Sequence, residues 1–241
     1  MTSTLPNRKA EIVYPSSDGE PLAETSVHID AIINAVVALR QYLAGQQAIV
    51  LTNQFLYYAE GFPKLRVAPD IMVIFNVAPG PRDSYKTWEE HQIPSVIFEI
   101  TSASTRDQDE TFKKTLYEQM EVQEYWQFDP KGEWISEQLR GYRLQNESYV
   151  PITDSWSEPL RLRLEVDGQL IDFFQESGEK LLAPNDLIEA LRQETLARQS
   201  AEVQLEQERQ RAEQERQRAE RAEAEVQRLK EQLRALGIEE R

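Results

Sequence analysis

Hydrophobic residues recur with helical spacing near the start of this chain. Residues 24–45 read ETSVHIDAIINAVVALRQYLAG, and the pattern predicts an amphipathic helix. Thr25 or Ser26 can cap its start and Gly45 can end it. The residues at helical spacing are Ile29, Ile32, Val36, Leu39 and Leu43. We expect this stripe to face the core.

The next part of the chain is rich in β-branched and aromatic residues. Strands are predicted at 47–58, 67–75, 95–101 and 124–129, with hairpins over 133–152 and 160–174. The segment 76–94 carries three prolines and is expected to be a long loop, whereas 109–120 has a helical pattern. A helix, strands, a helix between strands and further strands indicate an α/β fold with a mixed β-sheet core flanked by helices.

A third pattern begins near residue 185. The segment EQERQRA occurs at 206–212 and again at 213–219. A heptad register has Leu205, Ala212, Ala219, Val226 and Leu233 at position a, and Ala201, Glu208, Glu215, Ala222, Leu229 and Leu236 at position d. The register is strongest over 226–236. It favours a coiled coil that joins copies of the chain, and a solitary charged, solvated helix is the alternative.

Composition narrows the function classes. The chain has 241 residues, no cysteine and two histidines, which excludes disulfides and thiolate metal sites and argues against a multi-histidine metal cage. No signal peptide or membrane span is evident, so we expect a soluble, cytoplasmic protein without membrane partners. The net charge is −15, of which −3 belongs to 186–241, with 11 basic and 14 acidic residues. The other −12 lies in 1–185 and argues against broad attraction to nucleic acid.

Two carboxylates and a lysine are the candidate chemistry. Asp70 precedes the apolar run IMVIF, and Glu99 lies inside the apolar strand SVIFEIT. If the two strands are neighbours, their carboxylates can converge and share a hard divalent cation such as Mg²⁺. On a helical wheel that starts at Phe112, Lys113 lies within the apolar stripe and Lys114 points away. An inward lysine requires an anionic partner.

These segments resemble a known family. APDIMVIF, RDSYKTWEE, VIFEITSASTRDQDETFKKTLYEQMEVQEYWQFDP and GYRL followed by YVPI are similar to the putative restriction endonuclease family of Uma-two type, within the PD-(D/E)XK nuclease superfamily. The resemblance runs from about 23 to 184. The chain departs from the family at Glu121, where members usually have glycine, and we expect this change to affect a turn only.

The resemblance implies an Mg²⁺- or Mn²⁺-dependent DNA endonuclease. Asp70 and Glu99 would be metal-binding carboxylates, joined by the Ile100 carbonyl. The usual lysine position, two residues after the glutamate, is Thr101, so the resemblance is to members whose lysine lies on the next helix, at Lys113. Arg82, Lys86 and Arg106 are candidate contacts to flanking phosphates. The implied organisation is an arm (1–21), an endonuclease-like domain (22–184) and a coiled-coil helix (185–241), with DNA as substrate and self-association through the tail.

Several alternatives remain open at this stage. Glu99 and Lys113 could form a structural ion pair, and Asp107 and Asp109 favour helix N-caps over metal ligands. His28 is off the apolar stripe and is assigned to the surface or a pocket rim. The rival function is a nuclease fold that does not cut DNA and serves as an assembly module through its helical tail.

Overall fold

The structure is a computed structural model that describes residues 12–19, 23–102 and 105–235. It consists of two units, Met1–Asn185 and Asp186–Arg241. Of the N-terminal arm, residues 12–19 are described and contain no helix or strand. Among the described residues, no helix is long and apolar enough to span a membrane.

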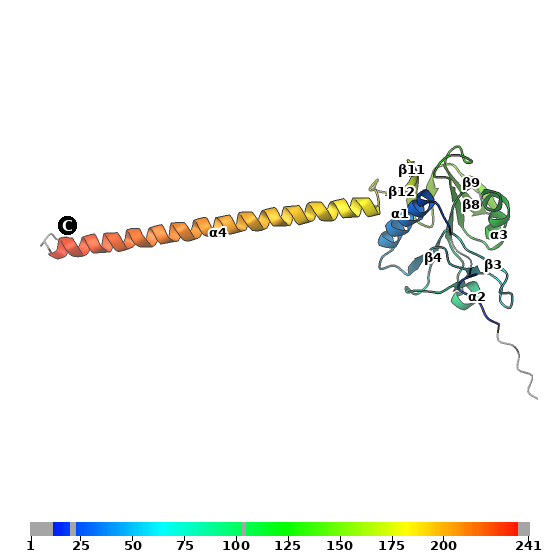
Figure 1. Cartoon of the computed structure of the whole chain (residues 1–241), viewed down its shortest axis with the longest axis horizontal. Coiled ribbons are helices and arrows are strands. Elements are labelled where there is room, and N and C mark those ends of the chain that lie inside the picture. Colours follow the sequence, from blue (N-terminus) through cyan, green and yellow to red (C-terminus); the bar gives the residue numbers. More distant parts are fainter. Residues whose placement is uncertain (1–11, 20–22, 103–104, 236–241) are drawn as a thin grey trace, which may run out of the picture. The chain divides into compact units, whose positions relative to one another are not determined.

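A six-stranded mixed sheet forms the centre of the first unit (Figure 1). The strand order is β1-β4-β6-β7-β8-β9, with β6 and β7 parallel and every other neighbouring pair antiparallel. The strands are β1 (Ala48–Leu51), β4 (Ile71–Phe75), β6 (Val96–Ile100), β7 (Glu124–Phe128), β8 (Leu139–Gln145) and β9 (Ser148–Ile152). This confirms the predicted α/β fold with a mixed sheet.

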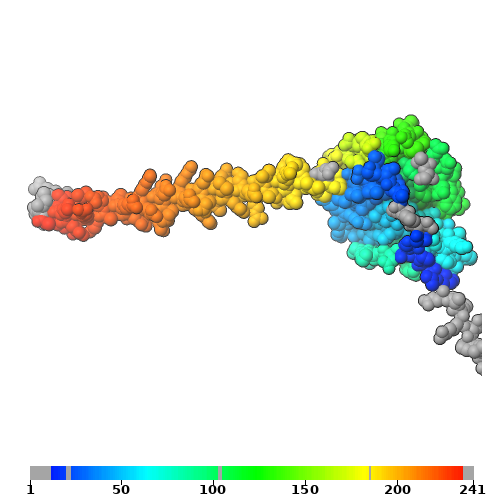
Figure 2. All heavy atoms as spheres, in the orientation of Figure 1, coloured from blue at the N-terminus to red at the C-terminus, as the bar shows by residue number. Residues whose placement is uncertain are grey.

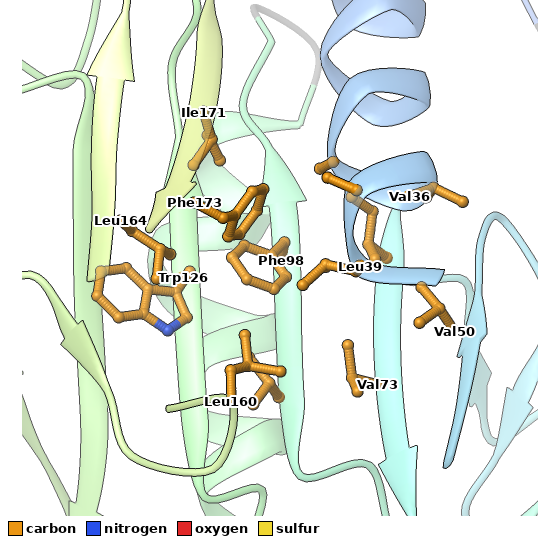
Figure 3. Close-up of a cluster of buried hydrophobic side chains, with 14 of the residues drawn as sticks. Val36, Leu39, Val50, Val73, Phe98, Trp126, Leu160, Leu164, Ile171 and Phe173 are labelled. Carbon is orange, nitrogen blue, oxygen red and sulfur yellow. The ribbon is translucent and has the colours of Figure 1, made fainter. Parts of the chain in front are cut away.

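One face of the sheet is covered by helix α1 (Ser26–Tyr42) and by a small sheet. This small sheet contains β10 (Trp156–Ser157), β11 (Leu162–Asp167) and β12 (Leu170–Gln175). Phe98 and Trp126 of the central strands pack with Leu39 of α1 and Phe173 of β12 in one apolar cluster (Figure 3). The Asn34 side chain donates to the Ile171 carbonyl at 3.0 Å, which ties α1 to β12.

The other face is covered by a helical segment and a second small sheet. The helical segment is η1 (Gln108–Lys113), a π-helical turn, followed by α3 (Lys114–Gln119). The second small sheet has the order β3-β2-β5, from Arg66–Val67, Leu56–Tyr57 and Tyr85–Lys86. Because strand side chains alternate between faces, Phe98 points to the α1 side and Glu99 to the α3 side.

Trp126 explains why a glycine lies in strand β8. Gly141 is directly opposite Trp126 in the β7–β8 ladder. A Cβ atom at Gly141 would lie 2.6 Å from the indole ring, closer than any packing arrangement allows. The absence of a side chain at Gly141 therefore makes room for the buried tryptophan.

Some local predictions were wrong. Ile29 is 43% exposed, although the four later residues of the predicted stripe in α1 are buried. The predicted strand at 47–58 is divided into β1 and β2, which belong to different sheets, and Asn53 between them has a left-handed backbone. The predicted loop 76–94 contains β5 and the short helix α2 (Thr87–Glu90).

Helix α4 (Pro184–Ala235) makes up nearly all of the second unit. Every residue from Ile188 to Ala235 is exposed, and Figure 2 shows the side chains projecting along the helix. The exposed large side chains include Leu205, Val226, Leu229 and Leu233 of the heptad pattern. Leu236, the last predicted d position, lies outside the described residues.

Candidate active site

Strands β4 and β6 bring Asp70 next to Glu99. The antiparallel ladder pairs Ile71 with Phe98, and continuing the same register by one residue sets Asp70 opposite Glu99. Side chains of directly opposed residues share a face of the sheet and lie close together. One oxygen of Asp70 accepts a hydrogen bond from the Ile100 amide at 2.7 Å, which fixes this carboxylate at the end of β6.

Both oxygens of the buried Glu99 carboxylate have partners inside the protein. Its side chain is 1% exposed, and Lys113 Nζ lies 2.9 Å from Oε2. The Tyr117 hydroxyl donates to Oε1 at 2.6 Å. Glu99 is therefore paired with a cation and a phenol that both come from the helical segment following β6.

Lys113 bridges two buried acids. Its ammonium nitrogen is 2.9 Å from Glu99 and also 2.9 Å from Asp109, one turn earlier in the π-helical segment. Asp109 is fully buried and lies inside η1, so the prediction that it is a helix N-cap was wrong, and Asp107 occupies the N-cap position. Its backbone carbonyl also accepts from the Tyr125 hydroxyl at 3.0 Å.

Lys113 points inward, as the helical wheel predicted. Phe112, the apolar residue from which the wheel was counted, does not. Phe112 is 55% exposed, because η1 is a π-helix with more residues per turn than the wheel assumes. Lys114 points elsewhere, and its ammonium lies 3.6 Å from the centre of the Tyr142 ring. The two adjacent lysines thus have different environments.

His28 approaches Asp70 from the other side. The Thr25 side chain caps α1 by accepting from the His28 amide at 3.3 Å, which fixes His28 in the first turn. Its Nε2 is 3.4 Å from Asp70 and its Nδ1 is 3.6 Å from Glu24, both longer than ordinary hydrogen bonds. His28 is 4% exposed, so the assignment to the surface was wrong, although the ring does line a pocket.

The site holds more negative than positive charge. Burial raises the pKa of the Glu99 carboxyl, and repulsion from Asp70 and Asp109 adds to the rise, against the attraction of Lys113. Burial likewise raises the pKa of Asp109. Burial alone would lower the pKa of Lys113, but attraction to Glu99 and Asp109 outweighs it and raises that pKa. The three carboxylates around one ammonium would be stabilised by a further cation.

The donor set suits a hard divalent ion. Among the described residues, no group of three or more His, Cys, Asp or Glu side chains is arranged to hold a metal. Mg²⁺ commonly binds through one or two carboxylates and completes its shell with water and phosphate oxygens, which matches the pair Asp70 and Glu99.

The Ile100 carbonyl is a third candidate donor. The β4–β6 register, continued by two residues, sets Pro69 opposite Ile100. The Ile100 amide already reaches the β4 side, and in an antiparallel ladder the carbonyl of the same residue points to that side too. Proline has no N–H to donate to it. The sequence Pro69-Asp70 therefore removes a ladder hydrogen bond where a metal ligand is expected.

The basic residues proposed for flanking phosphates are engaged with acids. Arg82 contacts Glu90 at 2.9 Å, Lys86 contacts Glu89 at 2.9 Å, and Arg106 contacts Asp107 at 3.3 Å.

Three residues of the site were not predicted from the sequence to belong to it: Asp109, His28 and Tyr117. Asp109 and Tyr117 had a local signal, because they lie four residues before and four residues after Lys113.

Comparison with known proteins identifies the family. A family model described as "Uma2: Putative restriction endonuclease" matches residues 3–169, more than half of the chain. The chain belongs to this family. The Uma2 match includes β4, β6 and the helical segment that carries Lys113, so all of the candidate site lies within it.

Other comparisons are less extensive. No curated protein matches this Uma2 family member. Among solved structures, it is similar to a protein described as a putative nuclease belonging to DUF820 from Anabaena variabilis ATCC 29413. The two are 17% identical, with a TM-score of 0.41, and the match covers 69% of this chain and 82% of that one.

Proposed function

We propose that this chain is an endonuclease that hydrolyses phosphodiester bonds in DNA with the help of Mg²⁺ or Mn²⁺. Membership of a restriction endonuclease family supports a nuclease function in general. The observation that carries the finer proposal is the convergence of Asp70, Glu99 and Lys113 at the ends of two adjacent strands. Two carboxylates can bind a divalent ion and one lysine can stabilise developing negative charge, a combination that suits phosphodiester hydrolysis.

Each residue has a distinct role in this proposal. Asp70, Glu99 and the Ile100 carbonyl would hold the ion, and the hydrogen bond from the Ile100 amide would keep Asp70 oriented. The bound ion would polarise the scissile phosphate and lower the pKa of a water molecule. Tyr117 would orient Glu99 through the 2.6 Å hydrogen bond.

Lys113 would act as an electrostatic group. An ammonium has three N–H donors, and the contacts to Glu99 and Asp109 use two of them. Among the described residues it contacts these two acids, so one donor remains for a substrate oxygen or the attacking water. A positive charge held at this point stabilises the negative charge that develops on the phosphoryl group.

The rival proposal is an inactive nuclease fold that assembles other proteins. The observation that favours it is the acidic first unit, in which Arg82, Lys86 and Arg106 are paired with acids. A protein that attracts bulk duplex DNA would present unpaired cations. The two proposals predict opposite results in a cleavage assay.

The test is cleavage of single-stranded, duplex and branched DNA with Mg²⁺, Mn²⁺ or EDTA. We expect cleavage with metal that is lost in Asp70→Asn and Lys113→Ala, whereas Lys114→Ala, the matched control, keeps it. Absence of cleavage on every DNA form would reject the endonuclease proposal in favour of the assembly module. Cleavage that persists in Asp70→Asn would place the chemistry elsewhere.

A further inference from the structure

A pocket of about 470 Å³ adjoins the candidate active site. It shares His28 and Ile100 with that site and extends from the first turn of α1 to the turn after β7. Its volume falls within the range of about 300–1,000 Å³ that is usual for small-molecule pockets. The mechanism above makes no use of it.

The pocket lining contains a buried hydroxyl without a partner. Thr101 is 5% exposed, and its hydroxyl has no hydrogen-bond partner among the described residues. His28 also lines the pocket, but its ring nitrogens already face Asp70 at 3.4 Å and Glu24 at 3.6 Å. A buried polar group without a partner is costly, and Thr101 lines the pocket. A ligand that forms a hydrogen bond with the Thr101 hydroxyl would remove this cost.

The opposite side of the pocket is aromatic and firmly positioned. Trp134 and Pro130 belong to the turn after β7, and both line the pocket. Asp129 is fully buried and accepts hydrogen bonds from the amides of Lys131, Gly132, Trp134 and Ile135, at 2.7–3.2 Å. These four hydrogen bonds hold the backbone of the turn in place, and the half-buried Trp134 side chain lines the pocket, where it offers an aromatic surface for stacking.

We propose that this pocket binds one unpaired nucleobase of the DNA substrate, next to the scissile phosphate. The inference rests on the proposed nuclease function and adds its substrate class. Trp134 would stack on the base, and the Thr101 hydroxyl would meet its polar edge. A base that is stacked and paired inside a duplex cannot enter such a pocket, so the expected substrate is single-stranded DNA.

The acidic charge of the first unit agrees with this substrate. Duplex binding depends mainly on phosphate contacts by basic residues. Stacking of a neutral base needs no such surface, and aromatic platforms bind single strands with little sequence preference. Lys131 lines the pocket together with the acids Glu24 and Glu133, so the proposal depends on stacking and not on attraction to a phosphate.

The first test measures binding without cleavage. A labelled single-stranded oligothymidylate is titrated in EDTA with the full-length protein, and its anisotropy is followed. We expect Trp134→Ala to weaken binding by about 5- to 150-fold, the usual range for one stacked base. Thr101→Val, which keeps the shape of the side chain, should weaken it by about 2- to 10-fold.

The controls separate stacking from folding. Trp156→Ala removes another half-buried tryptophan that does not line the pocket, and it should bind like the wild type. Trp134→Phe keeps a ring and should bind with intermediate affinity. If Trp134→Ala fails to fold, the Trp134→Phe and Thr101→Val variants decide the question. Unchanged binding in both would overturn the proposal, as would duplex DNA of the same sequence binding with equal dependence on Trp134.

A second measurement separates this inference from the nuclease function. Binding that depends on Trp134 in a protein with no cleavage activity would support the pocket and reject the endonuclease. Cleavage that depends on Lys113 but has the same KM in Trp134→Ala and the wild type would support the endonuclease and reject the pocket.

Discussion

Lys113→Ala should destabilise the first unit strongly, whatever its effect on activity. The change removes the cation that contacts two buried acids, Glu99 and Asp109, each at 2.9 Å. Removal of one partner of a buried ion pair lowers the free energy of unfolding by about 3–5 kcal/mol, because the other charge is left buried and uncompensated. For a domain of this size, each kcal/mol lowers Tm by roughly 2–4 °C, which gives a decrease of roughly 6–20 °C.

The neighbouring lysine is the matched control. Lys114 makes a cation–π contact with Tyr142, at 3.6 Å from the ring centre. Loss of a partly exposed contact of this kind costs about 0.5–1 kcal/mol, so Lys114→Ala should lower Tm by only a few degrees. Thermal unfolding followed by circular dichroism measures both variants. Equal Tm values for the two variants would refute the buried arrangement of Lys113.

A double variant separates a structural ion pair from a catalytic lysine. Glu99→Gln combined with Lys113→Met removes Lys113 and one of its two acids, so only Asp109 is left uncompensated and the doubly changed protein should be more stable than Lys113→Ala. If the pair is only structural, a stable double variant has no reason to lose cleavage. We expect no detectable cleavage, and Lys113→Ala itself should lose at least about 100-fold. A stable double variant that cleaves normally would refute the catalytic role of both residues.

Three further predictions concern the metal, the helix end and the tail. Mg²⁺ or Mn²⁺ should raise Tm by ligand linkage, and the Asp70→Asn, Glu99→Gln double variant should lose this response in differential scanning fluorimetry; an unchanged response would put the ion elsewhere. Glu121→Gly should stabilise the protein by about 0.5–1 kcal/mol in urea unfolding, since Glu121 has a left-handed backbone with φ of 60° at the end of α3; destabilisation would contradict this reasoning. Deletion of 195–241 should leave a folded first unit and abolish self-association in light scattering, whereas a full-length protein that is monomeric at tens of micromolar would contradict the coiled coil.

The parts of the fold that follow from periodicity were predictable from the sequence. The apolar runs around Asp70 and Glu99 predicted two strands, and these strands are neighbours in the sheet. Alternation along β6 predicts that Glu99 and Phe98 point to opposite faces of the sheet. The turn of the β8–β9 hairpin was also predictable, and Asn146 and Glu147 have the positive φ angles that a tight hairpin turn requires.

The partners of the site residues were less predictable, because they depend on tertiary contacts. Asp109 has the composition and position of an N-cap, but in the structure it lies inside the π-helical turn, buried beside Lys113. His28 is off the apolar stripe of α1, so no rule for a single helix explains its burial against Asp70. Glu121 was expected to affect only a turn, and the left-handed backbone there shows the conformation that glycine usually supplies.

The length of α4 would affect how strongly self-associated chains bind DNA. The helix has 52 residues and would be about 78 Å long, at 1.5 Å per residue. The best heptads begin near Val226, about 60 Å along it, whereas Glu208 and Glu215 interrupt the apolar seam before that point. Two chains paired through their distal heptads would share a long tether. Binding of one chain to DNA would raise the effective concentration of the other over distances of many base pairs, so avidity would come from tether length as well as from the affinity of each site.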